Sequence, residues 1–264
     1  MIGHRGAAKY APENTLAGLR KAKALGCCWV EFDVRLTADG QLVLLHDDRL
    51  QRTTDGQGKA SELPLAAVRR HDAGSRFDAG FTGERVPTLE QAVRLLAELG
   101  LAANVELKAV HGRGADTGIA AANMLARLWP SELPAPLISS FLFDALAAAR
   151  RCVPEIARGV LFRAVPKNWR DLAGRLGCAT VHADHRRLHG AIVAEIRGSG
   201  YPLLAYTVND PQRARTLFAW GVTSVFSDDP QRLILDTAAV GRGPVHPGMT
   251  DPNPAVMRRH GAAW

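Results

Sequence analysis

The chain has 264 residues, 47% of them hydrophobic, which is enough apolar material for one domain with a full core. The net charge of +7 does not indicate nucleic-acid binding, because the basic residues are scattered and no aromatic interleaving or zinc signature accompanies them. A basic surface that attracts an anionic small molecule is the better interpretation. The N-terminus lacks an apolar signal segment, and no window reaches the ~18 apolar residues of a membrane helix. The four cysteines show no zinc-ligand or disulfide spacing. We therefore expect free, buried thiols and a cytoplasmic protein without membrane insertion.

Short apolar runs alternate with segments of helical period along most of the chain. The first runs lie at residues 1–3 and 29–36, and a short extended run follows at 42–45. From Thr88, where Thr88 and Gln91 form a capping box, the alternation is regular to about residue 239. Asp210-Pro211 and Asp229-Pro230 place a cap before a helix-starting proline, and glycines follow several helices. The remaining predicted strands lie at 102–108, 136–141, 156–162, 179–183, 202–208 and 223–227.

Eight strand–helix units in one chain predict an α/β protein with the (β/α)8 architecture of a TIM barrel. A doubly wound open sheet is the structural alternative. The segment at about 48–87 is polar, rich in glycine and aspartate, and too irregular for a barrel helix, so we interpret it as a small insertion after the second strand. Residues 1–240 are predicted to form the single domain, and the proline- and glycine-rich residues 241–264 an irregular tail.

Acidic residues interrupt two of the apolar strands. Glu31 and Asp33 lie two residues apart in WVEFDVRL, so their side chains share one face of the strand. Glu106 lies in the next barrel strand, in the run Asn104-x-Glu106-x-Lys108. All-oxygen ligation by three carboxylates favours Mg²⁺ or Ca²⁺ over zinc. The alternative is that each carboxylate forms an ion pair with an arginine at the barrel rim.

Histidines and cations follow the same strands. His4 and His46 lie at predicted strand ends, where histidine can both accept and donate a proton near neutral pH. Arg5 has a planar guanidinium that suits a phosphate, and Lys108 offers a second positive charge. A metal site, two cations and two histidines together indicate phosphoryl chemistry.

These motifs resemble the glycerophosphodiester phosphodiesterase family. The resemblance rests on GHRGAAKYAPENTLAGLRKA, GCCWVEFDVRLTADGQLVLLHDDRLQRTTDG, PTLEQAV, NVELK and YTVND, and it spans nearly the whole chain except the tail. It implies a TIM barrel with an inserted segment after the second strand. By resemblance, the metal ligands are Glu31, Asp33 and Glu106, the acid/base pair is His4 and His46, and Arg5 and Lys108 hold the phosphate.

The chain departs from the family pattern at a few positions. Tyr206 stands where the family usually has tryptophan, so the wall against the alcohol part of the substrate is expected to differ. His4 lies so close to Met1 that either the first strand is very short or the natural start lies upstream. We interpret Glu13 and Asn14 of the PENT motif mainly as a loop and helix cap, with Glu13 as a candidate supporting group for the site. His182, Asp184 and His185 are expected on the surface or in loops, although His182 could line the pocket.

The expected reaction is metal-dependent hydrolysis of a glycerophosphodiester to sn-glycerol 3-phosphate and an alcohol. A metal-dependent sugar isomerase or aldolase is one alternative, but it would gain little from Arg5. A phosphate-ester binding module without catalysis is another, and the complete set of histidines and carboxylates argues against it. The sequence leaves open the headgroup, the native metal, the role of each histidine, the nucleophile and the oligomeric state.

Overall fold

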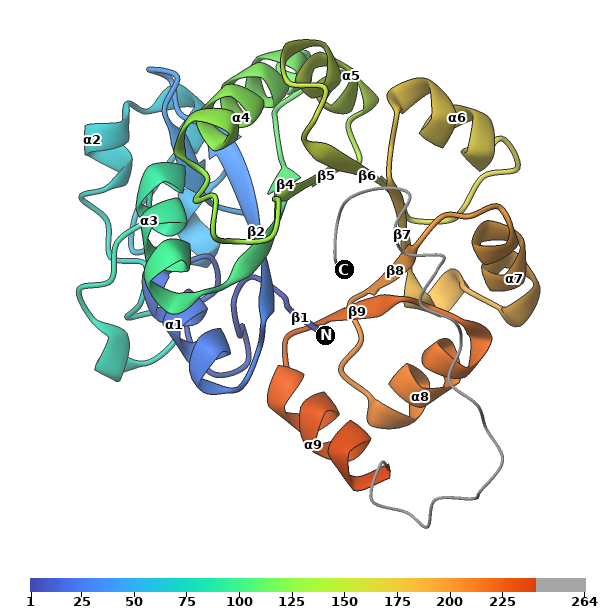
Figure 1. Ribbon diagram of the computed structural model, residues 1–264. Helices are drawn as coiled ribbons and strands as arrows, with labels where there is room; N and C mark the ends of the chain where they lie inside the picture. Colours follow the sequence, from blue (N-terminus) through green and yellow to red (C-terminus); the bar gives the residue numbers. More distant parts are fainter. Residues whose placement is uncertain (241–264) are drawn as a thin grey trace.

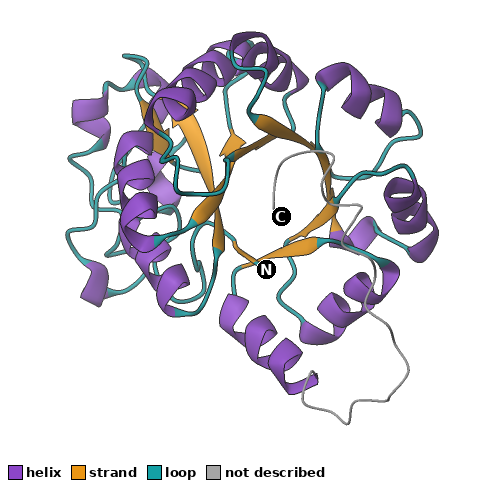
Figure 2. Cartoon of the chain, in the orientation of Figure 1, coloured by secondary structure: helices purple, strands orange, loops and turns teal. Residues whose placement is uncertain are grey.

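The computed structural model describes residues 1–240, which form a closed barrel surrounded by helices (Figure 1). Eight strands of these residues run parallel in the order β1-β9-β8-β7-β6-β5-β4-β2, and the pairing of β1 with β2 closes the ring. The helices lie outside the ring of strands (Figure 2). This confirms the predicted (β/α)8 architecture and excludes the open-sheet alternative. The barrel strands are β1 (Ile2–Gly3), β2 (Trp29–Leu36), β4 (Ala102–Leu107), β5 (Leu137–Ser140), β6 (Ala157–Phe162), β7 (Thr180–Asp184), β8 (Leu203–Tyr206) and β9 (Ser224–Ser227).

The first strand is only two residues long, yet it closes the barrel. Ile2 pairs with Trp29 on one side and with Phe226 on the other. The backbone N–H of His4 then donates to the carbonyl of Ser227 at 2.9 Å. This ladder fixes the point at which the chain leaves β1, so the short strand suffices to position His4.

Several barrel helices begin or end at residues that the sequence indicated. Thr88 and Gln91 form the complete capping box of α3, and Asp210 caps α8 through Gln212 and Arg213. The residues that end α3, α6 and α8 are glycines in the left-handed conformation, where other residues are strained. The helices are α1 (Leu16–Ala24), α3 (Leu89–Leu99), α4 (Gly114–Leu128), α5 (Phe143–Cys152), α6 (Trp169–Leu176), α7 (Gly190–Gly198), α8 (Pro211–Trp220) and α9 (Pro230–Val240), with the short α2 (Leu65–Val68) in the insertion.

The segment between β2 and α3 has a small hydrophobic core of its own. β3 (Leu42–Leu44) runs antiparallel to β2 and extends the sheet beyond the barrel, and α2 and three single-turn 3₁₀ helices follow. The side chains that form this core are separate from the main core; they are Val43, Leu45, Leu50, Ala60, Val68, Ala73 and Val86. Polar composition alone suggested an irregular insertion, but these spaced apolar residues give it a packed centre.

Asp72 organises the second half of this insertion, and removing it is expected to destabilise the segment. Its carboxylate accepts hydrogen bonds from the backbone N–H groups of Gly74, Ser75 and Gly83 at 2.8, 2.7 and 2.6 Å. Asp72→Ala should therefore lower the free energy of unfolding at pH 7 by about 2 kcal/mol or more. Denaturant unfolding measures this loss, and Asp78→Ala is the control because Asp78 accepts only one such bond, from Gly80.

The destabilisation should also depend on pH. The three backbone hydrogen bonds lower the pKa of Asp72 well below its ordinary value of 3.8. The folded state therefore binds this proton more weakly than the unfolded state, and Asp72 contributes its full stability above its ordinary pKa. The difference in unfolding free energy between the wild type and Asp72→Ala should shrink as the pH falls below this ordinary pKa. A gap that is constant from pH 7 to about pH 3 would contradict this role for the carboxylate.

All four cysteines are free, but only Cys27 and Cys178 are buried, so the prediction of buried thiols is wrong for Cys28 and Cys152. No helix among residues 1–240 combines the length and hydropathy needed to cross a membrane. The predicted tail, residues 241–264, lies outside the described residues. The division of the chain into one catalytic domain and a tail stays a prediction.

Candidate active site

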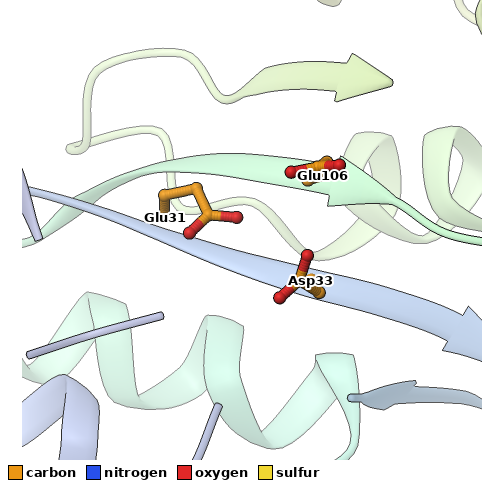
Figure 3. Close-up of side chains that lie close together, drawn as sticks. All are labelled: Glu31, Asp33 and Glu106. Carbon is orange, nitrogen blue, oxygen red and sulfur yellow. The ribbon is translucent and has the colours of Figure 1, made fainter. Parts of the chain in front are cut away.

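Three buried carboxylates converge on the inside of the barrel. Glu31 and Asp33 extend from β2 and Glu106 from the neighbouring β4, and Figure 3 shows their carboxylates gathered between the two strands. One oxygen from each lies within 4.8 Å of the other two. The parallel register pairs Asp33 with Glu106 and Glu31 with Asn104, so the two strands present their inward residues at matching heights. The predicted convergence of these residues is thus present in the structure.

The cations around these carboxylates neutralise them unequally. The Nζ atom of Lys108 lies 3.3 Å from Asp33 and 2.5 Å from Glu106, and the Nε atom of Arg5 lies 3.3 Å from Asp33. Burial alone would raise the pKa of Asp33, but Lys108 and Arg5 outweigh it and lower this pKa. Among residues 1–236, no lysine or arginine forms an ion pair with Glu31. Ion pairing at the rim therefore accounts for only part of the cluster.

Glu31 is the carboxylate of the cluster that no lysine or arginine of residues 1–236 pairs with. Burial and the neighbouring carboxylate of Asp33 raise the pKa of Glu31 to about 8. Burial also raises the pKa of Glu106, although Lys108 opposes the shift. One oxygen of Glu31, Oε1, is buried and has no hydrogen-bond partner among the described residues. Such an orphaned oxygen beside two further carboxylates suits a divalent cation with oxygen ligands, so these residues fit a metal site.

A tight turn after β1 brings Arg5 to the carboxylates. Arg5 has a φ of 50° and Gly6 a φ of 89°, both in the left-handed region that most side chains disfavour. A Cβ on Gly6 would lie 2.6 Å from the backbone of Gly18 in α1, so this position also requires glycine. The turn directs the backbone N–H of Arg5 to Glu31 at 2.9 Å. The strained conformation of Arg5 is therefore held by contacts on both sides.

The PENT motif supports the same carboxylates. Asn14, with a φ of 56°, donates from its side chain to Asp33 at 2.9 Å and accepts from the backbone N–H of Asp33 at 3.0 Å. Glu13 joins two guanidiniums, since it accepts from Arg5 at 2.8 Å and from Arg52 of the insertion at 2.7 Å. The residue that caps helix α1 is Thr15, which follows Asn14. Asn14 thus orients a carboxylate, a role that the loop-and-cap interpretation missed.

His4 is held by an aspartate from the opposite end of the chain. Its Nδ1 atom lies 2.6 Å from Asp228, and its Nε2 atom lies 3.9 Å from Glu31. Asn209 fixes Asp228 in turn, donating to its carboxylate at 2.8 Å. Burial alone would lower the pKa of His4, but the hydrogen bond to Asp228 and the charge of Glu31 outweigh it and raise this pKa. His4 therefore favours the protonated form.

His46 has a similar partner but the opposite tendency. Its Nδ1 atom lies 2.6 Å from Asp47, and its backbone carbonyl accepts a hydrogen bond from the buried Arg35 at 2.7 Å. Arg35 also binds Leu45 and Asp48, so it fixes the chain where β3 ends. Burial lowers the pKa of His46, and the nearby Asp33 opposes this only in part. His46 therefore favours the neutral form.

These groups line one cavity of about 680 Å³ at the carboxyl ends of the barrel strands. Its residues come from almost every strand unit of the barrel, so the catalytic candidates face a common space. Predicted residues on its wall are His4, Arg5, Glu31, His46, Glu106, Lys108 and Tyr206, and further lining includes Asn104, Phe141, Arg163, His182, Asp184, Arg186 and Arg187. Asp33 lies behind this surface, within reach of Arg5 and Lys108.

Similarity to known proteins identifies the family of this chain. Residues 4–232 match the model of the glycerophosphoryl diester phosphodiesterase family, and this range contains all the site residues described above. The chain belongs to this family. It is 31% identical over 235 residues to a glycerophosphodiester phosphodiesterase of Caldanaerobacter subterraneus, covering 89% of this chain and 96% of that protein. A Bacillus subtilis glycerophosphodiester phosphodiesterase is 30% identical, with coverage of 87% and 83%.

Solved structures agree with this assignment. A phosphodiesterase of Oleispira antarctica, solved in complex with the product sn-glycerol-3-phosphate, is 40% identical with a TM-score of 0.87 and coverage of 90% and 96%. A glycerophosphodiester phosphodiesterase of Agrobacterium tumefaciens is 26% identical with a TM-score of 0.74, covering 89% of this chain and 98% of that one. The predicted family, the barrel and the assignment to phosphodiester hydrolases are therefore confirmed.

Two polar residues of β7 lie in the barrel interior, where we did not expect them. His182 and Asp184 are not surface residues, because both lie on β7 and are buried, and His182 lines the cavity. The strand pattern could have revealed this, since Thr180, His182 and Asp184 alternate just as Glu31 and Asp33 do. The Nδ1 atom of His182 has no hydrogen-bond partner among the described residues, and burial lowers the pKa of His182 to about 3. Its imidazole is therefore neutral.

Tyr206 also lies on the cavity wall. Its ring packs edge to face against Phe141, with centroids 5.8 Å apart, and its hydroxyl donates to the carbonyl of Phe162 at 2.9 Å. Burial raises the pKa of Tyr206, so it stays protonated. The ring thus forms a fixed wall across the cavity from the carboxylates.

Proposed function

We propose that the protein hydrolyses glycerophosphodiesters to sn-glycerol 3-phosphate and an alcohol in a reaction that depends on a divalent metal. The observation that carries this proposal is a cluster of three buried carboxylates beside a cavity that His4, His46, Arg5 and Lys108 line. Family membership and the product-bound relative from Oleispira antarctica support the substrate class. A sugar isomerase or aldolase would gain little from Arg5 beside these carboxylates.

Glu31, Asp33 and Glu106 would hold the cation, for which their oxygen donors favour Mg²⁺ or Ca²⁺. When bound, a divalent cation neutralises negative charge on phosphoryl oxygens. Arg5 and Lys108 would bind the phosphate from the protein side. Their own carboxylate partners orient them, since Arg5 contacts Glu13 and Lys108 contacts Glu106. Tyr206 would form the wall against the alcohol part of the substrate.

The two histidines would act as the acid and the base. Their pKa values move in opposite directions, upward for His4 and downward for His46, so His4 is the better proton donor of the pair and His46 the better acceptor. His46 would take the proton from the attacking hydroxyl group, and His4 would protonate the oxygen of the leaving group. Asp228 and Asp47 would hold the two rings in orientation. The cytoplasmic location stays a prediction.

The direct test is incubation of the purified protein with glycerophosphocholine and Mg²⁺ or Ca²⁺. We expect sn-glycerol 3-phosphate and free choline, which a stereospecific glycerol-3-phosphate dehydrogenase assay and mass spectrometry distinguish from other products. Release of phosphocholine and glycerol instead would mean that the other ester bond breaks. No cleavage of any glycerophosphodiester with either metal, accompanied by ligand binding, would favour a binding module.

A further inference from the structure

Three arginines line the part of the cavity that the proposed mechanism does not use. Arg163 follows β6 directly, and Arg186 and Arg187 lie in the single 3₁₀ turn after β7. All three are exposed at the rim. One carboxylate, that of Asp184, lies on the same wall. Positive charge therefore predominates there.

Two of these arginines have no partner within the described chain. Arg186 forms a bidentate ion pair with Asp184, with contacts of 2.7 to 3.2 Å. The side chains of Arg163 and Arg187 form neither a hydrogen bond nor an ion pair with any of residues 1–236. The wall thus carries two uncompensated guanidiniums that face a cavity, an arrangement that suits an anionic group with oxygen acceptors.

These arginines lie across the ring from the metal candidates. β6, β7 and β8 lie on the opposite side of the barrel from β2, which carries Glu31 and Asp33 (Figure 1). A continuous set of contacts joins the two sides. Lys108 lies 5.7 Å from the ring centre of Phe141, Phe141 packs on Tyr206, and Tyr206 binds the backbone carbonyl of Phe162, next to Arg163. A phosphodiester with its phosphate at Arg5 and Lys108 can therefore extend along this wall toward the arginines.

A second hollow on the other side of His4, of about 640 Å³, lacks this character. Three of its positive groups are each paired with one of its carboxylates: Arg5 with Glu13, Lys9 with Asp229, and His4 with Asp228. Its charge is therefore nearly balanced, and only Arg232 adds a further cation. A strongly anionic substrate group would gain more from the arginine wall than from this hollow.

We propose that Arg163 and Arg187, supported by Arg186, make the enzyme selective for glycerophosphodiesters whose alcohol part carries a further negative charge, such as a second phosphate or a carboxylate. This inference rests on the proposed function. The glycerol part is neutral in every such substrate, so a positive wall discriminates through the alcohol part alone. Cationic headgroups such as choline would be disfavoured by the same wall.

The test compares three substrates that differ in headgroup charge: glycerophosphocholine, glycerophosphoglycerol, and glycerophosphoglycerol with a phosphate monoester on its terminal hydroxyl. Substrate loss is followed by mass spectrometry, and kcat/KM is measured for each. We expect the phosphate-bearing diester to exceed the neutral one by about tenfold or more, and this ratio to fall as salt rises. The double variant Arg163→Gln/Arg187→Gln should bring the ratio close to one. Arg232→Gln, which removes one positive charge from the second hollow, should leave the ratio unchanged.

The other outcomes overturn the inference in distinguishable ways. Equal kcat/KM for all three substrates in the wild type would remove the selectivity while leaving the proposed hydrolysis intact. An equal loss for all three substrates in the double variant would show that the arginines act on the shared phosphate. A change of ratio in Arg232→Gln alone would place the headgroup in the second hollow. No hydrolysis of any of the three would overturn the proposed function, and this inference with it.

Discussion

Replacing His4 or His46 with alanine is expected to lower kcat by about 100-fold or more, the usual contribution of a positioned acid or base. The effect should fall on kcat more than on KM, because the proton is in transfer in the transition state and not in the bound ground state. Both histidines face the cavity and each is fixed through Nδ1 by an aspartate, so the loss should reflect chemistry rather than folding. Steady-state kinetics with glycerophosphocholine measure it, and circular dichroism checks that each variant is folded. The exposed His189 provides the control variant His189→Ala.

The pH profile of the wild type should be bell-shaped. Burial holds the pKa of His46 below 6.5, so activity should fall on the acid side as His46 becomes protonated. His4 has a raised pKa because Asp228 and Glu31 outweigh its burial, so activity should fall on the alkaline side as His4 loses its proton. Near-normal turnover in both alanine variants would exclude the acid/base assignment.

Glu31→Gln is expected to abolish metal binding without destabilising the metal-free protein. Because burial and Asp33 raise the pKa of Glu31 from its ordinary 4.5 to about 8, the folded state binds this proton more tightly than the unfolded state. The carboxyl therefore lowers stability progressively as pH rises from 4.5 to about 8. A glutamine keeps the shape but removes the charge. The metal-free variant should thus melt at or above the wild-type temperature at pH 8 and differ less at pH 6.

Metal binding should reverse the order of the two melting temperatures. A ligand that binds only the folded state at 100 times its Kd stabilises by about 2.7 kcal/mol, which raises Tm by a few degrees in a domain of this size. We expect that rise in the wild type and none in Glu31→Gln, measured by differential scanning fluorimetry with and without Mg²⁺ or Ca²⁺. Glu98→Gln, at an exposed carboxylate, is the control that should keep the rise. A metal-dependent rise that persists in Glu31→Gln would show that the ion binds elsewhere.

Local patterns were sufficient to predict the barrel and the centre of the site. The two-residue alternation of WVEFDVRL places Glu31 and Asp33 on one face, and the parallel order of strands brings Glu106 beside them. Both inferences need only the geometry of strands and the rule that strand ends meet at one edge. The strand-end positions of His4 and His46 follow from the same reasoning.

Partners that are distant in sequence could not be predicted in this way. Asp228, which orients His4, lies 224 residues away, and Arg52 meets Glu13 only because the insertion folds back over the barrel. The unpaired state of Arg163 and Arg187 depends on which carboxylates reach them, and no local pattern encodes that. His182 is different, since the alternation of β7 contained the signal that it faces inward.

The metal site is tested most directly by the release of sn-glycerol 3-phosphate from glycerophosphocholine by protein that has been stripped of metal and then resupplied. We expect release to stop with a chelator, to return with Mg²⁺ or Ca²⁺, and not to return in Glu31→Gln. Hydrolysis at full rate in the stripped wild type would contradict the assignment of Glu31, Asp33 and Glu106 as the metal site. So would a return of hydrolysis with metal that is as strong in Glu31→Gln as in the wild type.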